Sequence, residues 1–218
     1  GDYNLTLVGP PKQFLDQQKL AVESGHTFIA KTEHAISQEF IFVPYIPAME
    51  QWARRISRIR DFSLGGWFGN WSHYGYTPSA PAELINRMSW DPAPETPALL
   101  ETLAHRHYGP AAPAVVRAWN HFSDGIREFP YSDSVSRTPG PLQKGPSNPF
   151  FLDPTVPSFG PWRTWQNDLK WTAPWGPAIA TKSLARVRDS FRRGIAELEQ
   201  ARSTVTGADR EALEREWR

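Results

Sequence analysis

Cysteine is missing from this chain of 218 residues, and so are long apolar runs and any strong excess of one charge. Without cysteine there is no disulfide, no thiolate nucleophile and no cysteine-ligated zinc. The absence also means that cysteine usage does not indicate whether the protein resides in an oxidising or a reducing compartment. No stretch of about 18 apolar residues exists, so no segment is predicted to span a membrane. The chain has 24 Lys and Arg against 23 Asp and Glu, and hence no basic field for a nucleic-acid backbone. We therefore expect neither a membrane nor a nucleic acid as partner.

Two residue types are abundant instead. Proline, at 21 residues, is about twice as frequent as its average usage in proteins. Tryptophan occurs 10 times, which is high for any chain of this size. Rigid loops that carry flat aromatic faces suit recognition by stacking. The alternative for each tryptophan is that it fills the hydrophobic core.

Both ends of the sequence resemble cuts in a longer chain. An apolar-alternating run, Tyr3–Val8, begins almost at once, and the last helical pattern, from Ala208 on, has no Gly, Asn or Pro to end it. No signal-peptide pattern is present at the N-terminus. We expect a fragment, whose missing N-terminal part is then a candidate partner.

The first 80 residues alternate strand and helix. Strands are predicted at Tyr3–Val8, His26–Glu33 and Phe62–Trp71, with helices at Lys12–Glu23 and from Pro47 to Arg60. Strands separated by helices of about 12 residues pair in parallel through right-handed crossovers. Because polar residues gather where the strands end, and no glycine-rich phosphate loop occurs, we favour a barrel over a doubly wound sheet. The predicted fold class is α/β plus α: the last three βα units of a (β/α)₈-type barrel over residues 1–80.

Residues 81–218 contain no convincing strand, and a helical C-terminal region is predicted there. It includes a Pro- and Trp-rich loop at about residues 137–177.

The helix predicted from Pro47 to Arg60, within the first 80 residues, has apolar residues at i, i+3, i+4 spacing, which predicts one buried face. Its arginines are expected on the face that contacts water: Arg54, Arg55, Arg58 and Arg60.

The second strand carries the best candidate for chemistry. Period-2 alternation puts Lys31 and Glu33 on one face of the strand, and Phe28, Ala30 and Thr32 on the other. A Lys and a Glu at a strand end are costly unless they are paired or solvated. Glu33 is therefore the candidate catalytic carboxylate, and the charge of the neighbouring Lys31 is expected to keep it ionised. Lys31 is also a candidate substrate-binding residue. The alternative is a structural Lys–Glu pair.

The third strand and the loop after it crowd aromatic and polar side chains together. Sugars present apolar faces that stack on aromatic planes, and hydroxyl groups that need polar partners. The candidate sugar-binding residues here are Trp67, Asn70, Trp71, His73, Tyr74 and Tyr76. The alternative to sugar binding is that these aromatic side chains cover the hydrophobic core.

Weaker candidates lie between these two strands. His34 and Tyr45 could contact substrate at the strand ends, and Glu39 could supply a second carboxylate. No HxH or HExxH spacing occurs, so we expect no metal, and no cofactor motif is present. The lack of a Gly-x-Ser-x-Gly elbow disfavours a serine hydrolase.

Several stretches resemble a known kind of enzyme. FIAKTEHAISQEF, VPYIPAMEQWARR and LGGWFGNWSHYGYTPSAPAELINRMSW look like the last barrel strands of large bacterial glycoside hydrolases. LLETLAHRHYGPAAPAVVRAWNHFSDGIREFP is similar to the helical region that follows the barrel in such enzymes. The resemblance is broadly to β-hexosaminidases and α-glucuronidases. It implies a glycan substrate, and it matches only Glu33 to a strand-end carboxylate.

Three hypotheses follow. In the first, the chain is part of a glycoside hydrolase that binds and hydrolyses a glycan at the barrel rim, and it is inactive alone if it holds only one of the two carboxyl groups that hydrolysis needs. In the second, it is a non-catalytic carbohydrate-binding or interaction module. The third is a metal-dependent barrel hydrolase, which a metal assay on the purified protein would test. A second carboxylate near Glu33 favours the enzyme, whereas a Glu33 paired only to Lys31 favours the module.

Overall fold

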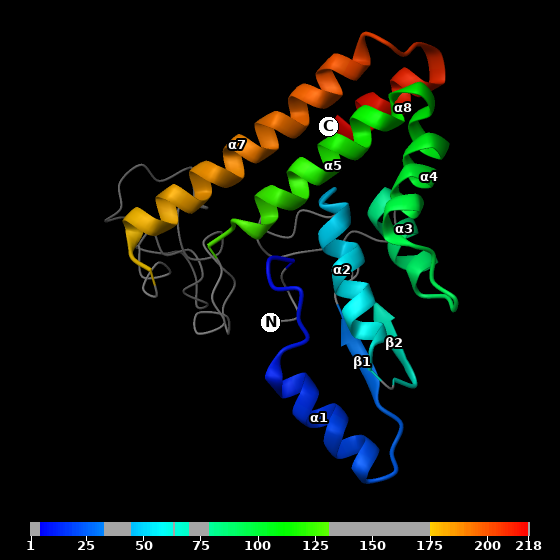
Figure 1. The fold of residues 1–218 in the computed structure, drawn as a ribbon, viewed down its shortest axis with the longest axis vertical. Coiled ribbons are helices and arrows are strands. Elements are labelled where there is room, and N and C mark those ends of the chain that lie inside the picture. Colours follow the sequence, from blue (N-terminus) through cyan, green and yellow to red (C-terminus); the bar gives the residue numbers. More distant parts are fainter. Residues whose placement is uncertain (1–4, 33–44, 63, 70–78, 131–174, 218) are drawn as a thin grey trace, which may run out of the picture.

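The computed structural model describes residues 5–32, 45–62, 64–69, 79–130 and 175–217 (Figure 1). Within these ranges helices dominate, and no helix is both long and apolar enough to cross a membrane. The elements, in chain order, are α1 (Lys12–Glu23), β1 (Ile29–Thr32), α2 (Met49–Arg60), β2 (Gly66–Gly69), α3 (Ala80–Met88), α4 (Thr96–Tyr108), the 3-10 turn η1 (Gly109–Ala111), α5 (Ala112–Arg127), α7 (Pro177–Arg202) and α8 (Gly207–Trp217).

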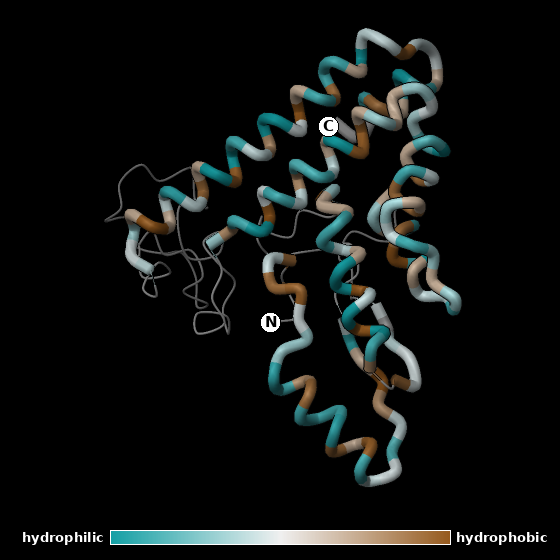
Figure 2. The backbone as a smooth tube through the Cα atoms, in the orientation of Figure 1, coloured by the Kyte–Doolittle hydropathy of each residue, from teal (hydrophilic) through white to brown (hydrophobic). Residues whose placement is uncertain are grey.

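The hydrophobic core lies between the helices. Helix α2 buries Trp52 and Ile56 completely, and α5 buries Trp119 completely. Helices α3, α4 and α8 add further buried side chains to the same cluster. Hydrophilic and apolar positions alternate along these helices (Figure 2), as expected for helices with one face in the core and one in water.

The strands β1 and β2 pair in parallel, with Ile29 opposite Gly66 and Thr32 opposite Gly69. Helix α2 is the crossover between them. The parallel pairing of the second and third predicted strands, and the helix between them, are confirmed. The burial alternation is confirmed too, because Ala30 and Thr32 are buried while Ile29 is 59% exposed.

The predicted barrel, however, is wrong. The only sheet in the described part of the chain has two short strands, and the remaining described elements are helices. The first predicted strand, Tyr3–Val8, is not a strand over its described residues 5–8. Leu5 is fully buried in the helical core, and its carbonyl accepts a hydrogen bond from the Gln51 side chain at 3.3 Å. The alternating apolar pattern therefore anchors this segment to α2 instead of forming a sheet ladder.

Helices α5 and α7 form an antiparallel pair along one side of the molecule (Figure 1). Each carries the sequence Phe-x-x-Gly, and each phenylalanine ring covers the glycine of the other helix. A Cβ on Gly125 would lie 2.8 Å from the Phe191 ring, and a Cβ on Gly194 would overlap the Phe122 ring. The two rings lie 5.1 Å apart. The glycines thus allow a closer approach of the two helices than alanines would.

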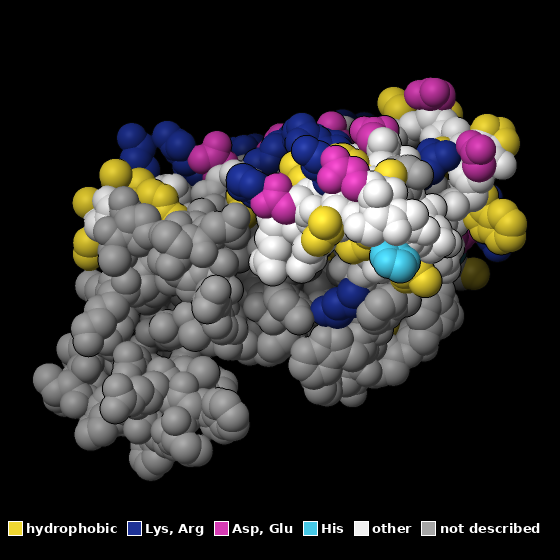
Figure 3. Space-filling view, turned by 90° about the horizontal axis from the view of Figure 1, so that it is seen from below, with side chains coloured by type: hydrophobic (Ala, Val, Ile, Leu, Met, Phe, Trp, Pro, Cys, Tyr) yellow, Lys and Arg dark blue, Asp and Glu magenta, His cyan; other side chains and the backbone are white. Residues whose placement is uncertain are grey.

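Ion pairs add little to this packing. Arg117 binds Glu197 at 2.8 Å and Arg186 binds Glu128 at 2.9 Å across the α5–α7 pair, with every side chain partly in water. Such exposed pairs contribute at most about 1 kcal/mol each. On the face in Figure 3, the described Lys and Arg side chains lie among Asp and Glu side chains. Apolar contact is therefore the main source of stability.

We predict that Gly194→Ala destabilises the protein. Helix propensity alone would stabilise the variant by about 1 kcal/mol, but the overlap with the Phe122 ring is expected to cost more, for a net loss of about 1–3 kcal/mol. Urea unfolding measures the difference. Gln200→Ala, at an exposed position of α7, is the control and should change stability by under about 0.5 kcal/mol. A more stable Gly194→Ala protein would contradict the close packing.

Candidate functional site

The C-terminal ends of β1 and β2 meet at one edge of the sheet. Thr32 and Gly69 are register partners at that edge, and Glu33 and Asn70 follow them in the sequence. The two segments that hold most of the predicted site thus begin side by side. Eight predicted site residues lie outside the described residues: Glu33, His34, Glu39, Asn70, Trp71, His73, Tyr74 and Tyr76.

Lys31 and Trp67 are described, and they occupy opposite faces of the strand pair. Register partners in a sheet share a face, so Trp67 shares the face of Ala30, which is buried against the helices. The Trp67 ring packs against the core cluster. Lys31 belongs to the other face and is half-buried. Trp67 therefore has a structural role in the core, and its predicted sugar contact stays a prediction.

Tyr45 lies in a strained turn just before α2. Its φ angle is +62°, a left-handed conformation that costs a non-glycine residue about 1–2 kcal/mol. The turn is held by two hydrogen bonds to the Ile46 carbonyl, from the Trp52 indole at 3.0 Å and from the Ala48 N–H at 2.8 Å. The Tyr45 ring packs partly against the core. Strain of this kind is found at binding and active sites more often than elsewhere.

Arg55 lies beneath the strand edge, which sequence reasoning missed. We predicted that Arg55 faces water, yet it is only 3% exposed. Its Nε donates a hydrogen bond to Thr32 Oγ1 at 3.3 Å, and it has further interactions as well. The signal was present, because position 55 is three residues after Trp52 and four before Ile59, both in the buried stripe. A buried guanidinium is costly without compensation, so the bond to Thr32 and the further interactions of Arg55 help to hold α2 against the end of β1.

A second charged cluster ties α3 to α4. Glu83 accepts hydrogen bonds from Arg106 at 2.6 Å, from Arg87 at 2.9 Å and from His107 at 2.6 Å. Burial raises the pKa of Glu83, but the bonds from His107 and Arg87 and the charge of Arg106 outweigh burial and lower it. Both carboxylate oxygens of Glu83 are bonded, and two of the donors come from α4, so the cluster is an interhelical tie.

This tie generates a pH prediction. A carboxyl group whose pKa is lower in the folded state stabilises the fold above its unfolded pKa, and this contribution is lost as pH falls through the folded value. Glu83→Gln should therefore cost about 1–3 kcal/mol at about pH 6, and the cost should shrink as the pH falls below the ordinary titration range of a glutamate. Urea unfolding over a series of pH values from about 6 downward is the measurement, with Glu101→Gln, an exposed position of α4, as control. A cost that does not shrink at any acidic pH at which the protein stays folded would contradict a stabilising Glu83 charge.

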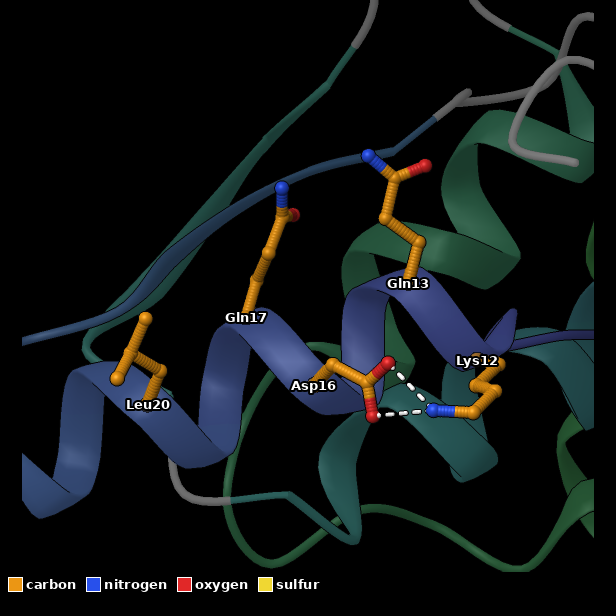
Figure 4. A pocket seen from close by; sticks show the side chains of 5 residues that line it. All are labelled: Lys12, Gln13, Asp16, Gln17 and Leu20. Atoms are coloured by element: carbon orange, nitrogen blue, oxygen red, sulfur yellow. Dashed lines mark hydrogen bonds and ion pairs between the residues drawn. The ribbon is translucent and has the colours of Figure 1, made fainter.

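A shallow hollow of about 400 Å³ lies on α1 (Figure 4). All five residues that line it come from this helix. Two of them, Lys12 and Asp16, form a solvent-exposed ion pair at 2.6 Å. A surface made by one helix has no second wall to enclose a ligand, so this hollow is not a candidate site. The described residues also hold no group of three or more His, Asp or Glu side chains that could bind a metal ion.

Comparison of the chain with family models, curated proteins and solved structures found no match. The resemblance to glycoside hydrolases thus stays a prediction from the sequence. The candidate site is defined by the strand edge, with Thr32, Lys31 and Arg55 as its described residues.

Proposed function

We propose that this chain binds a glycan at the edge formed by the C-terminal ends of β1 and β2. One observation carries the proposal: the parallel register pairs Thr32 with Gly69. The two sequence segments that hold the carboxylate, amide, imidazole and aromatic groups suited to sugars, residues 33–44 and 70–78, therefore start at the same edge. Hydroxyl groups of a sugar need such polar partners, and its C–H faces need aromatic planes.

A positive charge supports a role for Glu33. Lys31 is two residues before Glu33, and strand alternation puts both on the same face. Cationic groups near a carboxyl group favour its ionised form. An ionised Glu33 accepts hydrogen bonds from sugar hydroxyls, and charge-assisted bonds of this kind are stronger than neutral ones.

Hydrolysis of the glycan is the second candidate function, and the charge of Lys31 on the predicted Glu33 face favours it. Glycosidases use two carboxyl groups, about 5–5.5 Å apart for retention and about 6.5–9.5 Å apart for inversion. The sequence supplies Glu33 and, on the segment after β1, Glu39. A carboxylate held ionised by nearby cations suits a nucleophile or a general base.

Binding is tested by replacing an aromatic ring that follows β2. Trp71→Ala should weaken binding by about 1–3 kcal/mol, the scale of one lost aromatic contact. Calorimetric titration of the whole chain with chitohexaose, cellohexaose and glucuronoxylan oligosaccharides is the measurement. Leu20→Ala removes an apolar side chain that is 65% exposed on α1, and it should leave binding unchanged. If no oligosaccharide binds the wild-type chain, the proposal fails.

Hydrolysis is tested by Glu33→Gln, which keeps the shape of the side chain and removes its charge. Release of reducing ends from the bound oligosaccharide should fall at least a hundredfold, because removing a general acid or base costs about that much. Affinity should fall by a much smaller factor, because Gln still offers a neutral hydrogen-bond partner in place of the charged one. Glu39→Gln should do the same if Glu39 is the second carboxylate. A Glu33→Gln protein that binds normally but melts at a lower temperature would instead identify a structural pair with Lys31.

A further inference from the structure

Trp90 is the most exposed large apolar side chain in the described part of the chain, at 76%. It lies in the loop between α3 and α4, beside a hollow of about 360 Å³. Single exposed apolar residues are normal on protein surfaces, so exposure alone assigns no role. The hollow beside the ring is the second observation, because it is the size of a small-molecule site. The residues that line it are Arg87, Trp90, Pro94, Ala98, Leu99 and Thr102.

The hollow has walls from two elements and a stable floor. Leu99 is 4% exposed and belongs to the core cluster. The loop is anchored at its start, where the Ser89 hydroxyl donates to the Ile85 carbonyl at 2.7 Å. Asp91 pairs with Arg60 at the end of α2, at 3.3 Å. The indole is therefore presented on a supported loop instead of a free one.

Polar groups suited to hydroxyl partners stand at the rim. Arg87 donates a hydrogen bond from its Nε to Glu83 Oε1, and one of its terminal nitrogens pairs with the same oxygen. Because a guanidinium has five N–H donors in all, donors remain for a ligand. The Thr102 hydroxyl donates to the Ala98 carbonyl at 2.8 Å, which leaves its oxygen able to accept. A flat apolar plane, a planar donor group and an acceptor thus surround one hollow.

We propose that the Trp90 hollow is a binding site for one pyranose ring of a glycan. The ring stacks its C–H face on the indole, and its hydroxyl groups bond with Arg87 and Thr102. Recognition of a proline-rich peptide would instead use a groove with several aromatic walls, whereas Trp90 is the sole aromatic side chain among the described lining residues. The chemistry of the rim therefore favours a sugar.

This site is separate from the edge of β1 and β2 described above. None of the described residues that line the Trp90 hollow belongs to β1 or β2, or to the two segments that follow these strands. The inference thus does not rest on the proposed function.

The test follows the indole N–H signal of Trp90 by NMR in the whole chain. The signal is identified by its loss in Trp90→Phe, and the protein is titrated with chitohexaose, cellohexaose and glucuronoxylan oligosaccharides. We expect the signal to shift with at least one of the three, in the wild type and equally in Trp71→Ala. Trp90→Ala should lower affinity at this site about tenfold or more, the scale of a lost aromatic contact, and Thr102→Val should lower it by a smaller factor.

Ile179→Ala, which removes another exposed apolar side chain, is the control and should leave the titration unchanged. Three outcomes would overturn the proposal: no shift with any of the three sugars, a shift with decaproline but with no sugar, or a shift that depends on protein concentration alone. The last two would identify a peptide groove and a self-association surface. A Trp90 shift together with normal overall binding by Trp71→Ala would contradict the proposed function and leave this inference standing.

Discussion

Helix α2 is buried on most of its surface, and its polar side chains hold the neighbouring elements in place. Gln51 bonds the Leu5 carbonyl, Trp52 closes the turn before the helix, and Arg55 reaches the end of β1. Glu50 binds Arg127 of α5 at 2.8 Å, and the Glu50 N–H donates to Ser123. One helix thus fixes the N-terminal segment, the strand pair and α5 through hydrogen bonds that buried groups must make.

Such bonds are specific in a way that apolar contact is not. A hydrophobic face tolerates shifts and rotations at modest cost, whereas a buried donor that loses its acceptor costs about 1–3 kcal/mol. The buried Gln51 and Arg55 therefore select one placement of α2 among the many that its apolar stripe would allow. The strand edge next to the candidate site takes its position from that placement.

The sequence predicted correctly those elements whose positions follow from the periodicity of apolar residues. The spacing of apolar residues predicted the helix at Lys12–Glu23 to the residue, and it predicted the parallel pair on either side of α2. It failed at Tyr3–Val8, because alternation of apolar residues does not reveal whether the backbone joins a sheet or is anchored by a side chain such as Gln51. The barrel was inferred from polar residues at the strand ends, and such residues do not reveal how many strands a sheet has.

Site residues were harder to predict for a related reason. Strand alternation placed Lys31 opposite the buried face, as the structure has it, but pairing with the neighbouring strand decided the face of Trp67. Arg55 was misplaced because its charge was given more weight than its position in the apolar stripe. Trp90 was not singled out, since nothing in its local sequence distinguishes an exposed indole from a buried one.

The reciprocal packing of Phe122 and Phe191 on Gly194 and Gly125 has a consequence for the movement of α7. A slide of α7 along α5 by one helical turn, about 5.4 Å, would take each ring off its glycine and press it against a side chain. Unlike a flat apolar face, the two Phe–Gly contacts therefore oppose sliding of α7 along α5 in both directions.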